Sequence, residues 1–178
     1  GSADGSTVYM ALFNETLEKQ LTGLLKKIHP AFKTTLRTDK NGRRRDLACH
    51  VGKRFASFVT DICGQGAVNK RIPTEIFFAP VNIIQKFLDG YLSGDGTVWK
   101  NRISAATVSK ELRDGLYLLL ARLGIPASFY QETPISQFAS ANERYRIAVG
   151  GYYATALSFS GEKKAAWVDL YRVKTEQT

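Results

Sequence analysis

The chain has 178 residues, a length that suits one domain or two small halves fused together. Its 25 lysines and arginines outnumber 16 aspartates and glutamates, and the net charge of +9 favours an anionic partner, most commonly nucleic acid. The alternative is a basic protein whose charge is incidental. A membrane is not favoured, since the basic residues do not line one face of an apolar helix and no apolar run could span a bilayer.

The cysteines and histidines argue against two kinds of site. Cys49 and Cys63 lie among apolar neighbours and form no CxxC pair, so we expect two free thiols in a reducing compartment. The only histidines are His29 and His50, each in a different context. Neither a zinc site nor a Ser/His/Asp triad is therefore predicted.

The first half of the chain predicts a strand followed by an amphipathic helix. Residues 7–13 have strand character and lead to Asn14, a favourable helix N-cap. Leucine and isoleucine then recur at helical spacing as far as residue 28. His29-Pro30 ends this helix.

Two strands and a second helix complete the first half. The strands are expected at residues 32–37 and 44–51, and the turn sequence Asp39-Lys40-Asn41-Gly42 joins them. The second helix carries apolar residues between 55 and 62 and ends at Gly64.

The second half begins after a connector with two prolines. A helix is expected at residues 81–93, then a strand at 97–105. Ser109 can cap the next helix, whose leucines continue to residue 123. Strands at 127–131 and 145–149 and a last helix at 152–159 follow.

The two halves start alike. Ala3-Asp4-Gly5-Ser6-Thr7-Val8 resembles Gly94-Asp95-Gly96-Thr97-Val98, with the two aspartates 91 positions apart. The same order of elements follows each, which indicates an internal duplication; chance alternation of helices and strands is the alternative. We expect a first half at residues 3–66, a connector at 67–80, a second half at 81–162 and a tail at 163–178.

Residues 87–96, with the sequence FLDGYLSGDG, resemble the LAGLIDADG motif of homing endonucleases, in particular those carried by inteins. Residues 70–73 and 78–80 resemble the approach to the second such motif, and residues 104–123 are also similar to the family. The resemblance implies an α+β, pseudo-twofold duplicated LAGLIDADG homing endonuclease fold, with αββαββα in each half. Its curved antiparallel sheets would form a DNA-binding saddle.

The residue types in this motif have physical reasons. Gly90 and Gly94 are four positions apart and therefore share one face of a helix, where small residues let a second helix approach closely. The resemblance implies that such a pair of helices brings one acidic residue from each half to the floor of the saddle. Asp95 occupies that position, and Gly96 lets the chain turn at once into a strand.

The resemblance implies a divalent metal, Mg²⁺ or Mn²⁺, held by Asp95 and Asp4 close to the scissile phosphates. For Asp95 the alternative is an aspartate that only caps a turn. The family places a full helix before its first aspartate, and the sequence begins two residues before Ala3. We therefore expect the first motif helix to be cut through, which leaves open whether this polypeptide cleaves and exposes an apolar face that favours self-association.

A third catalytic candidate is Lys53. Family members often have a lysine just before the last helix of a half, and Lys53 follows the strand that ends at residue 51. There it could polarise the attacking water or a phosphate oxygen. The alternative is a solvated lysine.

Strand residues supply the candidates for DNA contact. In the family, alternate side chains of each strand face the major groove, where arginine and glutamine suit guanine and adenine. The polar residues in or beside the predicted strands are Arg37, Arg43, Arg45, Lys100, Arg102, Gln131, Arg144 and Arg146.

The resemblance implies a site-specific homing endonuclease that cuts both strands of double-stranded DNA at a long, pseudo-palindromic target. The protein would act as a pseudo-twofold symmetric monomer. The first alternative is an inactive LAGLIDADG-derived module that binds DNA or RNA, as a regulator or a maturase. The second is an α+β domain that binds another kind of partner.

Overall fold

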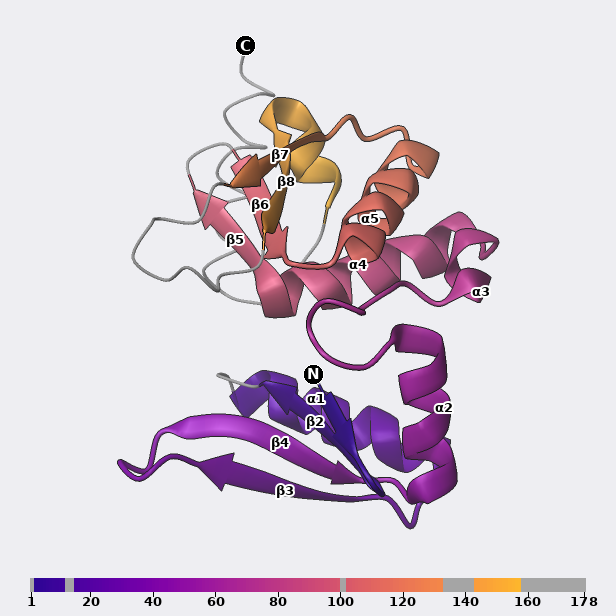
Figure 1. Ribbon diagram of the computed structural model, residues 1–178, viewed down its shortest axis with the longest axis vertical. Coiled ribbons are helices and arrows are strands. Elements are labelled where there is room, and N and C mark those ends of the chain that lie inside the picture. Colours follow the sequence, from indigo (N-terminus) through magenta and orange to yellow (C-terminus); the bar gives the residue numbers. More distant parts are fainter. Residues whose placement is uncertain (1, 12–14, 100–101, 133–142, 158–178) are drawn as a thin grey trace. The chain divides into compact units, whose positions relative to one another are not determined.

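The computed structural model describes residues 2–11, 15–99, 102–132 and 143–157, and the chain divides into two units, Gly1–Gly66 and Ala67–Thr178. Each unit has a four-stranded antiparallel sheet with helices on one face (Figure 1). In the part of the chain that the structure describes, no helix combines the length and apolar character needed to cross a membrane.

The first unit contains six elements. They are β1 (Ser2–Asp4), β2 (Thr7–Ala11), α1 (Glu15–Ile28), β3 (Lys33–Thr38), β4 (Arg44–His50) and α2 (Lys53–Cys63). The strand order is β1-β2-β4-β3, and both helices pack on the face that carries Val8, Leu47 and Cys49. Residues 12–14, including the expected N-cap Asn14, lie outside the described residues.

Local chemistry explains the turns of this unit. The Asp39 carboxylate accepts hydrogen bonds from the backbone N–H groups of Asn41 and Arg43, at 2.8 and 2.9 Å, and Gly42 has a φ of 73°. These interactions close the predicted turn between β3 and β4. Gly64, with a φ of 77°, ends α2 as expected.

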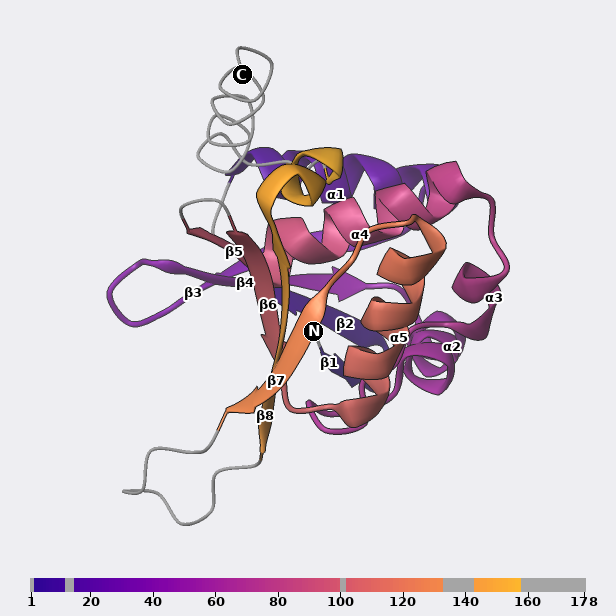
Figure 2. The ribbon, with the colours of Figure 1, turned by 90° about the horizontal axis from the view of Figure 1, so that it is seen from above.

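The second unit contains eight elements. They are α3 (Thr74–Phe77), α4 (Val81–Asp95), β5 (Gly96–Trp99), β6 (Arg102–Thr107), α5 (Lys110–Arg122), β7 (Ser128–Glu132), β8 (Arg144–Gly150) and the 3₁₀ helix η1 (Gly151–Ala156). The strand order is β5-β6-β8-β7, and Figure 2 shows α4 and α5 on the same side of this sheet.

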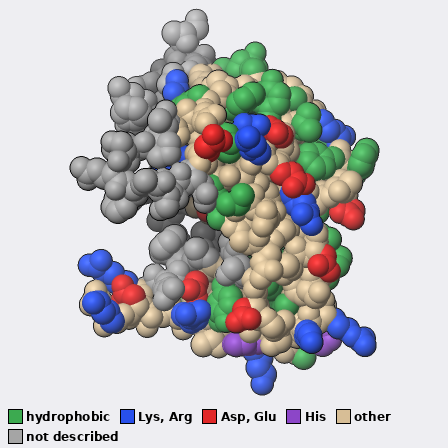
Figure 3. All heavy atoms as spheres, viewed as in Figure 1, with side chains coloured by type: hydrophobic (Ala, Val, Ile, Leu, Met, Phe, Trp, Pro, Cys, Tyr) green, Lys and Arg blue, Asp and Glu red, His purple; other side chains and the backbone are tan. Residues whose placement is uncertain are grey.

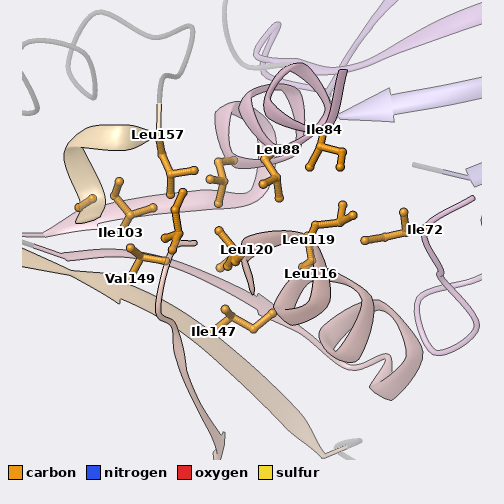
Figure 4. Close-up of a cluster of buried hydrophobic side chains, with 14 of the residues drawn as sticks. Ile72, Ile84, Leu88, Ile103, Leu116, Leu119, Leu120, Ile147, Val149 and Leu157 are labelled. Carbon is orange, nitrogen blue, oxygen red and sulfur yellow. The ribbon is translucent and has the colours of Figure 1, made fainter. Parts of the chain in front are cut away.

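The second core is the larger of the two. Among the described residues, fifteen buried side chains form it, against six in the first unit, and most come from α4, α5 and the inner face of the sheet (Figure 4). Ile84, Leu88 and Leu92, spaced by four residues, form the buried stripe of α4. Ser109 caps α5, because its hydroxyl accepts a hydrogen bond from the Leu112 N–H at 3.1 Å.

Two expected elements differ from the structure. The single strand predicted at 97–105 is a hairpin, because β5 and β6 pair with each other and Val98 lies opposite Ile103. The helix predicted at 152–159 is the short 3₁₀ helix η1, and residues after 157 lie outside the described part.

Equal strand orders confirm the duplication, but the alignment of the two halves differs from the sequence match. Thr7 pairs with the last residue of β4, and Arg102 pairs with the last residue of β8. Asp4 pairs with Thr7, and Trp99 pairs with Arg102. Asp4 therefore corresponds in the fold to Trp99 and not to Asp95.

The sequence match and the structural alignment differ because the Asp-Gly dipeptide can take two conformations. Asp-Gly suits a tight hairpin turn as well as the end of a helix. Gly5, with a φ of 54°, lies in the turn between β1 and β2, whereas Gly96 begins β5 directly after α4. The two Asp-Gly pairs are alike in sequence, but one belongs to a hairpin and the other joins a helix to a strand.

Candidate nucleic-acid interface

Asp95 is the last residue of α4, and its side chain is exposed. It borders a pocket of 330 Å³ within the second unit, whose polar lining residues are Lys70, Tyr91, Asp95, Thr107 and Arg144. One carboxylate thus lies beside two cationic side chains, an arrangement suited to a phosphate and a divalent cation together.

Gly96 places the carboxylate there. A Cβ atom at this position would lie 2.3 Å from the carbonyl oxygen of Leu92, closer than real atoms approach. Only glycine therefore lets the chain pass straight from α4 into β5, as the sequence predicts. Within the described residues, a Cβ at Gly90 or Gly94 would have no neighbour within 4 Å.

Tyr91 and Lys70 were not among the residues predicted from sequence. Burial raises the pKa of the Tyr91 hydroxyl, and the negative charge of Asp95 raises it further. Tyr91 therefore stays protonated at neutral pH and can donate a hydrogen bond. Its position four residues before Asp95, on the same helix face, was the available signal.

Lys70 is positioned by a long-range contact. The buried Ser109 hydroxyl donates a hydrogen bond to the Lys70 carbonyl oxygen at 2.6 Å, which ties the connector to the start of α5. The two residues are 39 positions apart, so nothing local in the sequence indicated this contact.

Asp4 and Lys53 lie together in the first unit. Both line a pocket of 250 Å³, with Ala56, Ser57 and Thr60 of α2 among its other residues. Lys53 is the first residue of α2 and is exposed, and it follows Gly52, which has a φ of 80°. The structure thus brings two of the three predicted catalytic residues to one pocket.

The outer face of the second sheet carries most of the predicted basic residues. Ile147 and Val149 of β8 are buried against the helices, so the alternate residues Arg144 and Arg146 belong to the opposite face. Arg102 of β6, which pairs with Gly150, belongs to that face as well.

Glu132 organises these arginines. The Arg146 Nε donates a hydrogen bond to a Glu132 carboxylate oxygen at 2.5 Å, and its Nη1 lies 3.3 Å from the Ser104 hydroxyl. Arg144 forms a longer ion pair with Glu132, at 4.0 Å. The Arg146 hydrogen bond lowers the pKa of the Glu132 carboxyl, so the pair stays ionised at neutral pH.

Gln131 lies on the face of the second sheet opposite to Arg144 and Arg146. It pairs with the buried Tyr145, on the face that packs against α5, and this corrects the expectation of a side chain alternating towards DNA. On that face, the Arg113 guanidinium stacks on Tyr145 and on Phe129, at 4.5 and 5.3 Å from the ring centres. Lys100 lies outside the described residues.

Lys33 and Arg37 belong to the outer face of the first sheet. Arg37 forms an ion pair with Asp46 at 3.5 Å and lies over the Tyr9 ring at 5.1 Å. The His50 ring nitrogens lie 3.2 and 3.3 Å from the hydroxyls of Thr7 and Thr35.

Further basic residues gather at the tip of the first sheet. Arg43 is exposed in the turn between β3 and β4, Arg45 belongs to β4, and Figure 3 shows Lys and Arg side chains together at this tip.

The donor chemistry at Asp95 fits a hard cation such as Mg²⁺, which prefers carboxylate oxygens. Among the described residues, no three histidine, cysteine, aspartate or glutamate side chains come together as a metal-binding group. Asp95 alone would therefore supply the charged ligand in its pocket.

Residues 82–155 match the model of the LAGLIDADG-like domain. This stretch is similar to that family of domains. It contains nearly all of α4, including Asp95, and the whole of the second sheet.

Parts of larger proteins resemble the chain. The ATP-dependent DNA helicase Hel308 of Thermococcus kodakarensis is 33% identical over 150 residues, which make up 79% of this chain and 13% of the helicase. A DNA polymerase of Thermococcus hydrothermalis is 43% identical over 68 residues, 38% of this chain and 4% of the polymerase. The chain thus spans only a small part of the length of these relatives.

Solved structures share the fold. The homing endonuclease I-DmoI in complex with DNA and Ca has a TM-score of 0.60 at 14% identity, over 81% of this chain and 68% of that one. The N-terminal LAGLIDADG domain of DUF199/WhiA has a TM-score of 0.52 at 11% identity, over 94% and 71%. The chain therefore has the LAGLIDADG homing endonuclease fold, and the expected α+β fold class is confirmed.

Proposed function

We propose that the chain is a DNA endonuclease domain that cuts both strands of a long, pseudo-palindromic duplex site with a divalent metal, Mg²⁺ or Mn²⁺. The observation that carries this proposal is the position of Asp95. It ends α4 of the LAGLIDADG-like domain and lines one pocket with Lys70 and Arg144.

The residues of this pocket suit phosphodiester hydrolysis. A bound Mg²⁺ would activate water and offset charge on the phosphate, and Asp95 would hold it. Lys70 and Arg144 would bind phosphate oxygens, and the protonated Tyr91 would donate a hydrogen bond. We assign a second, weaker centre to Asp4 and Lys53, which share the pocket of the first unit.

Duplex DNA would lie on the outer faces of the two sheets. Register or exposure supports this role for five predicted residues: Arg37, Arg43, Arg102, Arg144 and Arg146. Arg146, oriented by Glu132 and Ser104, is the best candidate for reading guanine. Lys100 and Arg45 remain proposals from the sequence, and Gln131 is left out because it faces the helices.

An origin within an intein is also part of the proposal. Similar stretches occur as small parts of a helicase, of DNA polymerases and of a probable translation initiation factor. A domain that recurs inside proteins of such different names behaves as an insert, and a DNA-cutting activity would explain how an insert spreads between genes.

Cleavage of plasmids that carry the uninterrupted helicase or polymerase gene tests the proposal. We expect Mg²⁺-dependent linearisation by the unchanged chain and its loss in Asp95→Asn, with DNA affinity kept within about twofold, because the amide retains the size but not the charge. Glu111→Gln, which removes an exposed acid from α5, is the matched control and should cut normally. If Asp95→Asn cuts as well as Glu111→Gln, Asp95 has no catalytic role.

The second candidate is a module that binds nucleic acid without cutting it. The observation in its favour is that the described residues bring no three potential metal-binding side chains together. It predicts tight binding with no product at any concentration of Mg²⁺ or Mn²⁺. A maturase would in addition prefer structured RNA over duplex DNA in direct competition.

A further inference from the structure

A row of aromatic rings runs along an open groove of the first unit. The His29 ring stacks on Phe32 with centres 5.1 Å apart. Phe32 contacts Phe55 at 5.2 Å, and Phe55 contacts Phe58 at 6.2 Å. All four rings line a groove of 820 Å³, within the range of about 300–1,000 Å³ that is usual for ligand sites.

This row ends in solvent. Phe58 is 54% exposed, although it is a large apolar side chain. The His29 ring is fixed at the other end, because its Nδ1 accepts a hydrogen bond from the Ala31 N–H at 3.2 Å. A neutral His29 therefore carries its proton on Nε2, as a donor.

The charges in the groove are of one sign. Lys53 and Arg54 line it together with His29 and His50, and none of its described lining residues is an aspartate or glutamate. Figure 3 shows histidine and basic side chains together at the lower edge of that view. The groove thus offers ring faces and cations side by side, which matches a ligand that has flat rings and an anionic backbone.

We propose that this groove binds a single-stranded polynucleotide, with an unpaired base stacked on Phe58 and the neighbouring phosphates held by Arg54 and Lys53. The bases of a duplex cover each other's faces, so only unpaired bases can use such a row. The site shares Lys53 with the proposed second centre, but stacking of a base on Phe58 goes beyond the proposed cleavage of duplex DNA and does not depend on it.

Fluorescence anisotropy of the full chain with labelled dT12 and rU12 tests this proposal. Base–aromatic stacking contributes about 1–3 kcal/mol, so Phe58→Leu should weaken binding roughly tenfold, while Phe58→Trp should keep or tighten it. Leu118→Ala, which trims an equally exposed apolar residue on α5, should change nothing. Comparison of dT12 with rU12 separates a DNA from an RNA ligand.

A second pair of variants tests whether basic residues of the groove bind the phosphates. Arg54→Gln should weaken binding severalfold and reduce its dependence on salt, whereas Lys86→Gln, which neutralises an exposed lysine of α4, should not. Unfolding followed by circular dichroism establishes that each variant folds. None of these changes replaces Asp95, Asp4, Lys53 or an arginine of the sheet faces, so duplex cleavage is measured separately for each variant.

Two results would overturn the proposal. Equal binding by the unchanged chain and Phe58→Leu would mean that an apolar side chain suffices, as it would for a peptide. Equal loss in Phe58→Leu and Leu118→Ala would mean that the oligonucleotide does not use the groove.

Discussion

The two units share one strand order and differ at the point where the first strand begins. In the second unit α4 leads directly into β5, and Asp95 lies at the junction. In the first unit the similar Asp-Gly pair lies in the hairpin turn between β1 and β2. The same two residues therefore present a carboxylate at a helix end in one unit and beside the start of α2 in the other.

The units also differ in core size and in the charge on their sheets. The second core has fifteen buried side chains and the first has six. The outer face of the second sheet carries three arginines and Glu132, while Arg37 of the first sheet is paired with Asp46. The two units thus share one strand topology but carry different side chains, which suits a target whose two halves are not identical.

The largest effect on stability should come from the cores. Leu119→Ala and Leu47→Ala each remove a fully buried leucine and should cost about 2–5 kcal/mol. Trp99 is the last residue of β5 in the second unit, so the tryptophan fluorescence of a Trp167→Phe chain during urea unfolding follows that unit. The two buried cores share no residue. Leu119→Ala should therefore lower the urea midpoint of the fluorescence transition, and Leu47→Ala should not.

Circular dichroism, which follows both units, should detect the Leu47→Ala loss as an earlier transition. Equal shifts of the tryptophan signal in both variants would instead show that the two units unfold as one.

The next largest effect should come from the junction between α4 and β5. Gly96→Ala forces a Cβ against the Leu92 carbonyl and should destabilise the second unit by about 1–3 kcal/mol. Gly90→Ala, in the same helix but with open space, should instead stabilise it by about 0.5–1 kcal/mol. Urea midpoints measure both, and a destabilising Gly90→Ala would indicate that a second helix packs on that face.

The two sheet faces should differ in DNA recognition. Arg146→Ala should reduce discrimination at one base pair by about 1–3 kcal/mol, because its guanidinium is held in a fixed orientation by Glu132 and Ser104. Arg37→Ala should weaken binding similarly for all sequences, since its 3.5 Å ion pair with Asp46 is longer than the Arg146 hydrogen bond and holds the guanidinium less closely. Binding to a library of single-base variants of the target measures both, and equal profiles would contradict the difference.

The smallest effect should be the pH dependence of Glu132. Its pKa is lowered in the folded chain, chiefly by the Arg146 hydrogen bond. Its contribution to stability is therefore present at neutral pH, above the pKa of about 4.3 of an unfolded glutamate, and is lost as the pH falls through the lower folded value. Melting of Glu132→Gln and the unchanged chain should differ at pH 7 and converge towards pH 3.

Much of the fold follows from local patterns in the sequence. The spacing of apolar residues predicts α1, α2, α4 and α5, and turn chemistry predicts the hairpin closed by Asp39 and Gly42. The predicted cap at Ser109 is confirmed because capping depends on residues three positions apart. The motif also indicated Asp95 and the need for glycine after it.

Features that depend on partners far apart in the chain were not predictable in this way. The pairing of Arg146 with Glu132, the tie between Ser109 and Lys70, and the meeting of Asp4 with Lys53 join different elements. The inward position of Gln131 depends on strand register, because a shift of one residue exchanges the two faces of a strand.

By itself, the sequence determined the elements, their order, their repetition and the acidic end of α4, because those depend on the spacing of neighbouring residues. Only the tertiary structure decided that Asp4 corresponds to Trp99, which arginines share a face, and which cations lie beside Asp95. Strand pairing sets these relations, and the free energy that selects one register comes from burying one whole face of each sheet.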